Sequence, residues 1–376
     1  MTWDDDALLG GPDVVVPVSS AGDPPLFLDY CETGVSPIPA AVRRVHEHAH
    51  ELNHYPRGLC DHAVRAIAAA HGVSESQVLL TNGVDEATDL VLLEARALTC
   101  VTPGFVGYWE RASALDVAAT YLPLTAEWEL PELWWHAAHP GSAFVVAQPN
   151  NPTGSSFGSA TWLDEALAMF SLVVVDETYR LVADAPMRSC VHREEENLLT
   201  FISLSKAYGL AGVRVGALVG SPPMIERLAR RKRFYSIDNL ALHAVIGALE
   251  DPDAVASATA AVKRLRPAYA RAIANAVGLF AEARMTDCTF VLGRVHERIG
   301  AHRLVSELAA GGVMVSDCAI SGMPGWLRVG VTDAATITKL TRALQRCELA
   351  LGADQPRRSY GPTTAPARRR SVRGAC

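Results

Sequence analysis

The stretch SLSKAYGLAGVRVG, from Ser203 to Gly216, decides how this chain is interpreted. Lys206 follows an apolar run that is typical of a strand, and the hydroxyl side chains of Ser203 and Ser205 lie beside it. A glycine-rich turn comes next, with Arg214 eight residues after the lysine. A cofactor that is held as a Schiff base and carries a phosphate needs these groups, because the amine forms the imine and the hydroxyls and guanidinium bind the phosphate. The length and fixed spacing of the pattern favour this interpretation over a solvated surface lysine.

Around this stretch, continuous apolar runs indicate strands that are buried on both faces of a parallel sheet. Helical patterns separate several of these runs, which is the alternation typical of an α/β fold. We expect the strands at residues 77–81, 98–101, 118–124, 143–147, 172–175, 200–203 and 214–220.

After Pro222 the pattern changes to long helical stretches, followed by strands that alternate with helices in a second, smaller α/β domain. We expect helices at 40–52, 224–234, 239–249, 255–281, 302–308 and 334–351, and strands at 289–293, 313–316 and 326–331. The helix at 255–281 is expected to bridge the two domains. The domains are then an N-terminal segment with part of the small domain (1–50), a large cofactor-binding domain (51–260), a small C-terminal domain (261–352) and a disordered arginine-rich tail (353–376).

The charge and apolar content exclude some classes of protein. The net charge is −7, although the last 22 residues contain six arginines and no acid, so the rest of the chain is more acidic and is a poor nucleic-acid binder. No apolar run is long enough to span a membrane, and the acidic N-terminus is unlike a signal peptide, so we expect a cytoplasmic protein. The eight cysteines are scattered without a C-x-x-C pair, which argues against a zinc site and a disulfide framework.

The segment HEHAH contains three histidines, His46, His48 and His50, and suggests a metal cluster. On a helix, however, residues two apart do not share a face, and the chain has no HExxH motif. We therefore predict a solvated helix surface here, and no metal site.

Two further motifs fit the cofactor that Lys206 suggests. QPNNPTG, at Gln148–Gly154, follows an apolar run, and in VVVDETYR, at Val173–Arg180, Asp176 comes at the end of one. A buried carboxylate is costly without a cationic partner, and a protonated ring nitrogen is such a partner. A protonated ring is also an electron sink for a carbanion at the substrate Cα. In TNGVDEA the amides of Val84 and Asp85 begin an expected helix, and a helix N-terminus favours a phosphate.

In this order, over about Leu26–Leu351, the motifs resemble the pyridoxal-phosphate enzymes of the class I/II aminotransferase superfamily (fold type I). They are most similar to its histidinol-phosphate aminotransferase branch, which shares the NGxDE and NPNNPTG-like loops, the D-E-x-Y segment, SLSKAxGLAGxRxG and the PGxLRxxV ending. The resemblance implies pyridoxal 5'-phosphate as the cofactor. It also implies a large domain with a mostly parallel seven-stranded sheet, and a smaller α/β domain.

The resemblance also assigns roles to single residues. Asn151 and Tyr179 are implied at the cofactor's phenolic oxygen, and Phe105 in PGFVGY is implied over the ring face. Arg328 in WLRVG is implied as the bidentate partner of the substrate carboxylate. Tyr55 in NHYPRG is implied to cross to the cofactor phosphate of a neighbouring subunit, which predicts a homodimer with composite sites.

The chain departs from this branch at two places near the expected substrate. Val35 in CETGVSP stands where the branch has a tyrosine, and Ser316 and Asp317 in VSD replace the arginine and proline of V-R-P. Both lost groups help to hold a substrate phosphate in that branch. With Glu32 and Asp317 nearby in sequence, we expect a substrate with a basic or neutral side chain, used in specialised (natural-product) amino-acid biosynthesis, rather than histidinol phosphate.

The leading hypothesis is an aminotransferase that moves an amino group between an amino acid and a 2-keto acid, with Lys206, Asp176 and Tyr179 as the catalytic residues. The same residues also suit a decarboxylase, or a cyclase or eliminase that acts at Cβ or Cγ. Histidinol-phosphate aminotransferase proper is a further alternative. A non-enzymatic regulator built on this fold is the last alternative, and failure to bind the cofactor would favour it.

Overall fold

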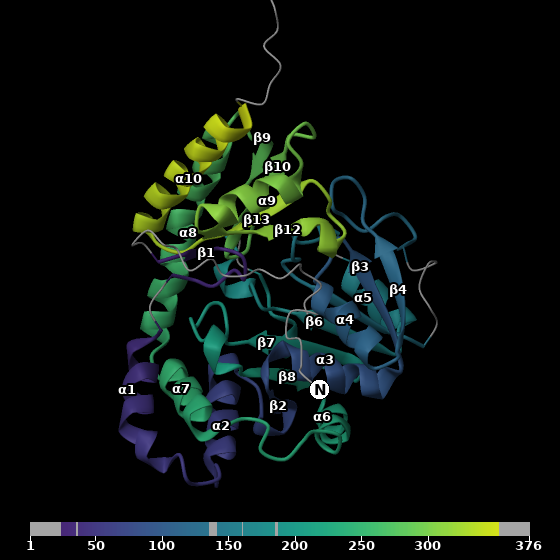
Figure 1. Cartoon of the computed structure of the whole chain (residues 1–376). Helices are drawn as coiled ribbons and strands as arrows, with labels where there is room; N and C mark the ends of the chain where they lie inside the picture. The colour runs from purple at the N-terminus through teal and green to yellow at the C-terminus, as the bar shows by residue number, and fades with distance from the viewer. Residues whose placement is uncertain (1–23, 35–36, 135–140, 160, 185–186, 353–376) are drawn as a thin grey trace, which may run out of the picture.

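The computed structural model describes residues 24–34, 37–134, 141–159, 161–184 and 187–352. Two α/β units are visible in it, one built on a large sheet and one, at the top of Figure 1, on a smaller sheet. Val35 lies outside the described residues, and so does the arginine-rich tail from residue 353.

The large sheet has seven strands in the order β2-β8-β7-β6-β5-β3-β4. Its strand β8 runs antiparallel to both neighbours, and every other pair of neighbours is parallel. The expected mostly parallel seven-stranded sheet is therefore confirmed. Its strands are β2 (Val78–Thr81), β3 (Ala97–Thr102), β4 (Ala118–Pro123), β5 (Ala143–Ala147), β6 (Leu172–Asp176), β7 (Leu198–Ser203) and β8 (Gly216–Gly220).

The central strands β5, β6 and β7 are apolar except at Asp176, Thr200 and Ser203, because both faces of the sheet are covered. In β5, Ala143 and Val145 belong to one apolar cluster, whereas Phe144 and Val146 belong to another. The first cluster includes residues of α3 (Gly83–Ala95), α4 (Val106–Ala114) and α6 (Pro222–Ala229), and the second includes α5 (Trp162–Met169).

A third apolar cluster joins the sheet to a group of helices and continues into the second unit. Its helices at the bottom of Figure 1 are α1 (Pro39–His48), α2 (Leu59–His71) and α7 (Asn239–Leu249), and α7 packs against both of the others. The long helix α8 (Pro252–Asn275) then leads from this group up to the smaller sheet, as expected for a bridging helix.

The smaller sheet has four antiparallel strands in the order β12-β13-β10-β9. A separate parallel pair joins β1 (Leu26–Phe27), near the N-terminus, to β11 (Val313–Met314). The remaining elements of this unit are β9 (Phe280–Arg284), β10 (Phe290–Val295), α9 (Ala301–Ala310), β12 (Ser316–Asp317), β13 (Trp326–Gly330) and α10 (Ala334–Gly352).

The structure corrects two expected elements in this unit. The helix expected at 255–281 ends at Asn275, and Phe280–Arg284 forms strand β9, because the chain turns near Gly278 and then pairs with β10. The strand expected at 313–316 is two short strands, since Val313–Met314 pairs with β1 and Ser316–Asp317 pairs with β13. The domain boundaries expected from the sequence stay a prediction.

Among the described residues, no helix combines the length and the apolar character that a membrane span requires.

Candidate active site

Three of the motifs meet at one edge of the large sheet. Strands β5, β6 and β7 are parallel neighbours, so their carboxyl ends lie side by side. The chain leaves β5 into the loop Gln148–Gly154, β6 ends at Asp176, and β7 ends at Ser203, three residues before Lys206. Ligands of α/β sheets bind at this edge, which makes it the candidate site.

Asp176 is a buried carboxylate at this edge, and its side chain is held by neutral donors. Its Oδ1 accepts hydrogen bonds from the backbone nitrogen (2.9 Å) and hydroxyl (2.5 Å) of Thr178, and its Oδ2 accepts one from the hydroxyl of Tyr108 at 2.7 Å. Burial raises the pKa of Asp176. No described lysine, arginine or histidine forms an ion pair with it.

Glu177, the next residue in the chain, differs from Asp176 in having a charged partner. Glu177 is also buried, but it forms an ion pair with Arg180 at 2.7 Å and accepts a hydrogen bond from the hydroxyl of Ser189 at 2.6 Å. Its charge is therefore compensated within the chain. Asp176 keeps the need for an external cation, and a protonated ring nitrogen meets that need.

Tyr108 is a site residue that the sequence analysis missed. It lies in α4, one turn after Phe105, and its pKa is raised well above the usual value by burial and by the nearby Asp176. The ring of Phe105 lies at the start of α4 and meets the ring of Tyr108 edge-on, with 5.2 Å between centroids. The available signal was the second aromatic residue in PGFVGY, three positions after Phe105 on the same helical face.

Lys206 extends toward the N-terminal segment of the chain. Its amine donates a hydrogen bond to the backbone carbonyl of Tyr30 at 2.6 Å, and its own carbonyl accepts one from the hydroxyl of Thr33 at 3.4 Å. Burial lowers the pKa of the amine. A lower pKa leaves more of the amine neutral, which is the form that acts as nucleophile or base.

The groups expected to bind a phosphate also meet at the sheet edge. Thr81 pairs with Gly216, and Gly216 pairs with Ser203, so the loop before α3 lies next to the end of β7. The guanidinium of Arg214 forms an ion pair with Asp85 at 2.9 Å, at the N-terminus of α3. A Cβ at Gly216 would lie 2.9 Å from the carbonyl oxygen of Ile202, so this packing requires glycine.

The first turn of α3 includes Val84 and Asp85, whose amides have the orientation that binds anions. Ser203 and Ser205 lie together, since the Ser203 hydroxyl accepts a hydrogen bond from the backbone nitrogen of Ser205 at 3.3 Å. A helix N-terminus, two hydroxyls and an arginine therefore form one cradle, and this set fits a phosphate.

Arg328 reaches the site from the smaller sheet. Its guanidinium donates to the side-chain oxygen of Asn151 at 2.6 Å, to the carbonyl of Asp29 at 2.9 Å and to the hydroxyl of Ser316 at 3.0 Å. The Nε atom of Arg328 is buried without a hydrogen-bond partner among the described residues. An unpaired buried donor on a guanidinium suits a carboxylate ligand.

Tyr179 lies near Arg328 in the same part of the molecule. It is buried, and its ring meets Phe290 of β10 edge-on at 5.7 Å between centroids. Burial raises its pKa well above the usual value, while the charge of Arg328 acts in the opposite direction.

The remaining predicted residues lie at the margin or away from these groups. Glu32 is exposed, and the carboxylate of Asp317 accepts a hydrogen bond from the backbone nitrogen of Ala319 at 2.9 Å. Tyr55 is 66% exposed, stacks on Tyr235 with 4.9 Å between ring centroids, and lines a different surface cavity. Within a single chain, Tyr55 is therefore not brought to the candidate site.

The prediction of a solvated surface at HEHAH is wrong for one histidine. His46 and His50 are exposed, but His48 is partly buried and its ring stacks on His243 of α7 at 3.8 Å between centroids. The sequence analysis compared histidines within one helix, whereas this contact joins residues that are distant in sequence.

Comparison with known proteins agrees with this geometry. Residues 29–345 match the family model described as aminotransferase class I and II. The histidinol-phosphate aminotransferase of Symbiobacterium thermophilum is 30% identical over 328 residues, which cover 85% of this chain and 89% of that protein. Histidinol-phosphate aminotransferase 2 of Pseudomonas fluorescens is 31% identical over 336 residues, covering 84% and 86%.

Solved structures show the same fold. A putative aminotransferase from Burkholderia pseudomallei is 27% identical with a TM-score of 0.78, over 87% of this chain and 100% of that one. The histidinol-phosphate aminotransferase of Sinorhizobium meliloti, in complex with pyridoxal-5'-phosphate, is 20% identical with a TM-score of 0.79, over 91% and 98%.

Proposed function

The chain belongs to the class I and II aminotransferases, which are pyridoxal-phosphate enzymes, and we propose that it transfers an amino group between an amino acid with a basic or neutral side chain and a 2-keto acid. The observation that carries the assignment of its site is Asp176. Among the described residues no cation pairs with this buried carboxylate, which lies at the same sheet edge as Lys206.

The residues at this edge fit pyridoxal phosphate. Asp176 would face the ring nitrogen, Asn151 and Tyr179 the phenolic oxygen, and Phe105 the ring face. The phosphate would be held by Ser203, Ser205, Arg214 and the amides of Val84 and Asp85. When bound, the cofactor supplies an electron sink that acidifies the Cα of the amino acid.

The chain's own residues then move the proton and hold the substrate. With the cofactor bound, the Nζ of Lys206, whose pKa is lowered by burial, would take the proton from the substrate Cα and deliver it to C4′ of the cofactor. Arg328 binds the substrate carboxylate through its buried Nε donor, which has no partner among the described residues, and its hydrogen bond to Asn151 at 2.6 Å fixes the guanidinium. Tyr108 keeps Asp176 in place.

The proposal for the substrate side chain rests on the region of Glu32, Val35 and Asp317. Ser316 stands where the histidinol-phosphate branch has an arginine, and it offers a hydroxyl that is already bonded to Asp29 and Arg328. With two acids and without that arginine, a phosphate tail is disfavoured by charge. A basic amino acid in a specialised biosynthetic pathway is the resulting assignment, with a neutral aromatic one as the alternative.

The test is a comparison of kcat/KM for a basic, an aromatic and a phosphorylated amino acid with one 2-keto acid as acceptor. We expect the basic or the aromatic substrate to be preferred. A preference for the phosphorylated substrate would show that another residue holds the phosphate, and would favour the activity that the relatives' names give. Carbon dioxide release in place of keto-acid formation would instead favour a decarboxylase.

Tyr55 supports a second part of the proposal, which is a homodimer with composite sites. An exposed tyrosine beside Tyr235 is available to a neighbouring subunit. We expect a dimer in sedimentation experiments and weaker cofactor retention in Tyr55→Phe. A fully active monomer would contradict this part. A cytoplasmic location stays an expectation.

A further inference from the structure

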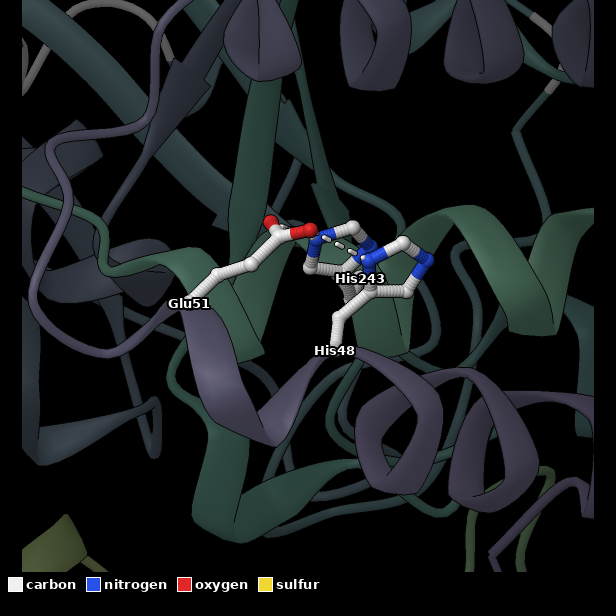
Figure 2. Close-up of side chains that lie close together, drawn as sticks. All are labelled: His48, Glu51 and His243. Atoms are coloured by element: carbon white, nitrogen blue, oxygen red, sulfur yellow. Dashed lines mark hydrogen bonds and ion pairs between the residues drawn. The ribbon is translucent and has the colours of Figure 1, made fainter.

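Outside the motifs of the candidate active site, three potential metal ligands lie together where α1 meets α7. His48 is the last residue of α1, Glu51 ends the 3₁₀ turn Ala49–Glu51, and His243 lies in the middle of α7. Figure 2 shows the carboxylate of Glu51 directed toward both imidazole rings.

The distances between the donor atoms are short. The Nδ1 atom of His48 lies 2.9 Å from one carboxylate oxygen of Glu51, and the Nε2 atom of His243 lies 3.4 Å from the other. One ligand atom of His48, one of Glu51 and one of His243 lie within 4.8 Å of one another.

Each ligand has a structural reason to be there. His48 and Glu51 are three residues apart, so they lie on the same helical face. His46 and His50 are each two residues from His48 and lie on other faces. His243 is 3% exposed, so the packing of α7 fixes its ring. Asn239, one turn earlier in α7, donates hydrogen bonds to the carbonyls of Glu51 at 3.1 Å and His54 at 2.7 Å, and these tie the turn to α7.

We propose that His48, Glu51 and His243 bind a divalent transition-metal ion of the zinc class. Two imidazoles and one carboxylate are a donor set that such ions prefer. At metal–ligand bonds of about 2.0–2.2 Å, tetrahedral geometry places neighbouring ligand atoms roughly 3.3–3.6 Å apart. The observed separation of 3.4 Å lies in that range, and the separation of 2.9 Å is shorter.

One adjustment is required for coordination. The rings of His48 and His243 are stacked, with 8° between their planes and 3.8 Å between their centroids, so their nitrogen lone pairs lie in separate, nearly parallel planes rather than meeting at one point. His48 has the freedom to turn, since its side chain keeps 31% of its surface exposed while that of His243 keeps 4%. Rotation of His48 and adjustment of the Glu51 carboxylate, whose side chain is 35% exposed, therefore complete the site around His243, which is already fixed.

The surroundings allow the remaining coordination positions to be filled by water. Glu51 and His243 line an open cavity of about 530 Å³ that also includes Tyr55 and His62. The nearest positive charge of α1, Arg44, is engaged by Glu250 at 3.3 Å. Because Tyr55 follows Glu51 on the same segment, a bound ion would stabilise that segment against α7.

The experiment uses untagged, cofactor-loaded protein, because a polyhistidine tag would bind the same ions. After treatment with a chelator and dialysis, zinc is added, and bound metal per chain and the thermal midpoint are measured. We expect one more equivalent of tightly bound zinc in the parent protein than in His48→Ala or Glu51→Gln, and a zinc-dependent rise in thermal midpoint that both variants lose. Affinity in the variants should fall at least tenfold.

The matched control is His46→Ala, an exposed histidine on the same helix, which should keep the extra equivalent and the thermal shift. Cobalt(II) supplies an independent readout, since a visible absorption band of a four- or five-coordinate ion should appear in the parent and in His46→Ala only. Equal zinc stoichiometry in the parent and in both ligand variants would overturn the proposal, and so would an equal loss in the control.

Discussion

The two ends of the candidate active site differ in how their polar groups are held. At the cofactor end the polar side chains are buried. They are Asp176 at the end of β6, Tyr108 in α4, and Tyr179 three residues after Asp176. At the substrate end, Glu32 is exposed, and Asp317 lies on a two-residue strand at the edge of the smaller sheet. A buried polar group is costly unless it is paired, whereas an exposed one changes at little cost. The cofactor end is thus constrained by folding, and the substrate end is free to set specificity.

The largest effect should come from Lys206 at the cofactor end. We expect Lys206→Ala to lose at least about 10⁴-fold in kcat, because acid–base catalysis at this position has no substitute. The variant should still fold and retain cofactor, since the ring and phosphate contacts come from other residues. Steady-state kinetics and cofactor absorbance measure the two properties, with the exposed Lys339→Ala as the control. Transamination at a normal rate would show that Lys206 is not the catalytic lysine.

The second effect should come from Asp176. Asparagine keeps the shape of the side chain but removes the only negative charge that we assign to the ring nitrogen, so the electron sink weakens. We expect Asp176→Asn to raise the barrier by about 4 kcal/mol, roughly a thousandfold in rate. A single-turnover assay at saturating cofactor tests this, and a loss of less than about tenfold, 1.4 kcal/mol, would count against the role.

Tyr108 should have a smaller effect at the same end. Tyr108→Phe removes one hydrogen bond, of 2.7 Å, to a buried carboxylate that keeps its two bonds from Thr178. A hydrogen bond to a charged group contributes about 1.5–3 kcal/mol, so we expect kcat to fall roughly 10- to 100-fold with a smaller change in KM. Tyr121→Phe, at a half-exposed tyrosine, is the control. Unchanged kcat would show that Thr178 alone positions Asp176.

The smallest effect should come from the substrate end and should concern selectivity. In Glu32→Gln combined with Asp317→Asn, we expect the ratio of kcat/KM for a basic over a neutral substrate to fall about tenfold, or roughly 1.4 kcal/mol. Cofactor retention should not change. An unaltered ratio would show that the two acids do not act on the substrate side chain. A loss of cofactor would show that they also support the cofactor end, so either result would contradict the distinction between the two ends.

Much of the fold followed from local patterns. The apolar runs at β5, β6 and β7 were recognised because both faces of these strands are covered, so every position is apolar except Asp176, Thr200 and Ser203. The pattern failed at β9, where Phe280–Arg284 continues a helical stretch in sequence and becomes a strand only by pairing with β10. Strand pairing is a non-local interaction, and it outweighed the local helical preference.

The sequence by itself determined the family and the cofactor, and it predicted the catalytic lysine, because contiguous motifs with fixed spacing carry that chemistry at the ends of strands. Only the tertiary structure joined Tyr108 to Asp176 and Arg328 to Asn151, since in each pair the two residues come from different elements. The same holds for His243, which lies 192 residues after Glu51 and reaches it because α7 packs on α1. Spacing along the chain determines which side chains share one face of a single strand or helix. Contacts between elements depend instead on how their apolar faces pack.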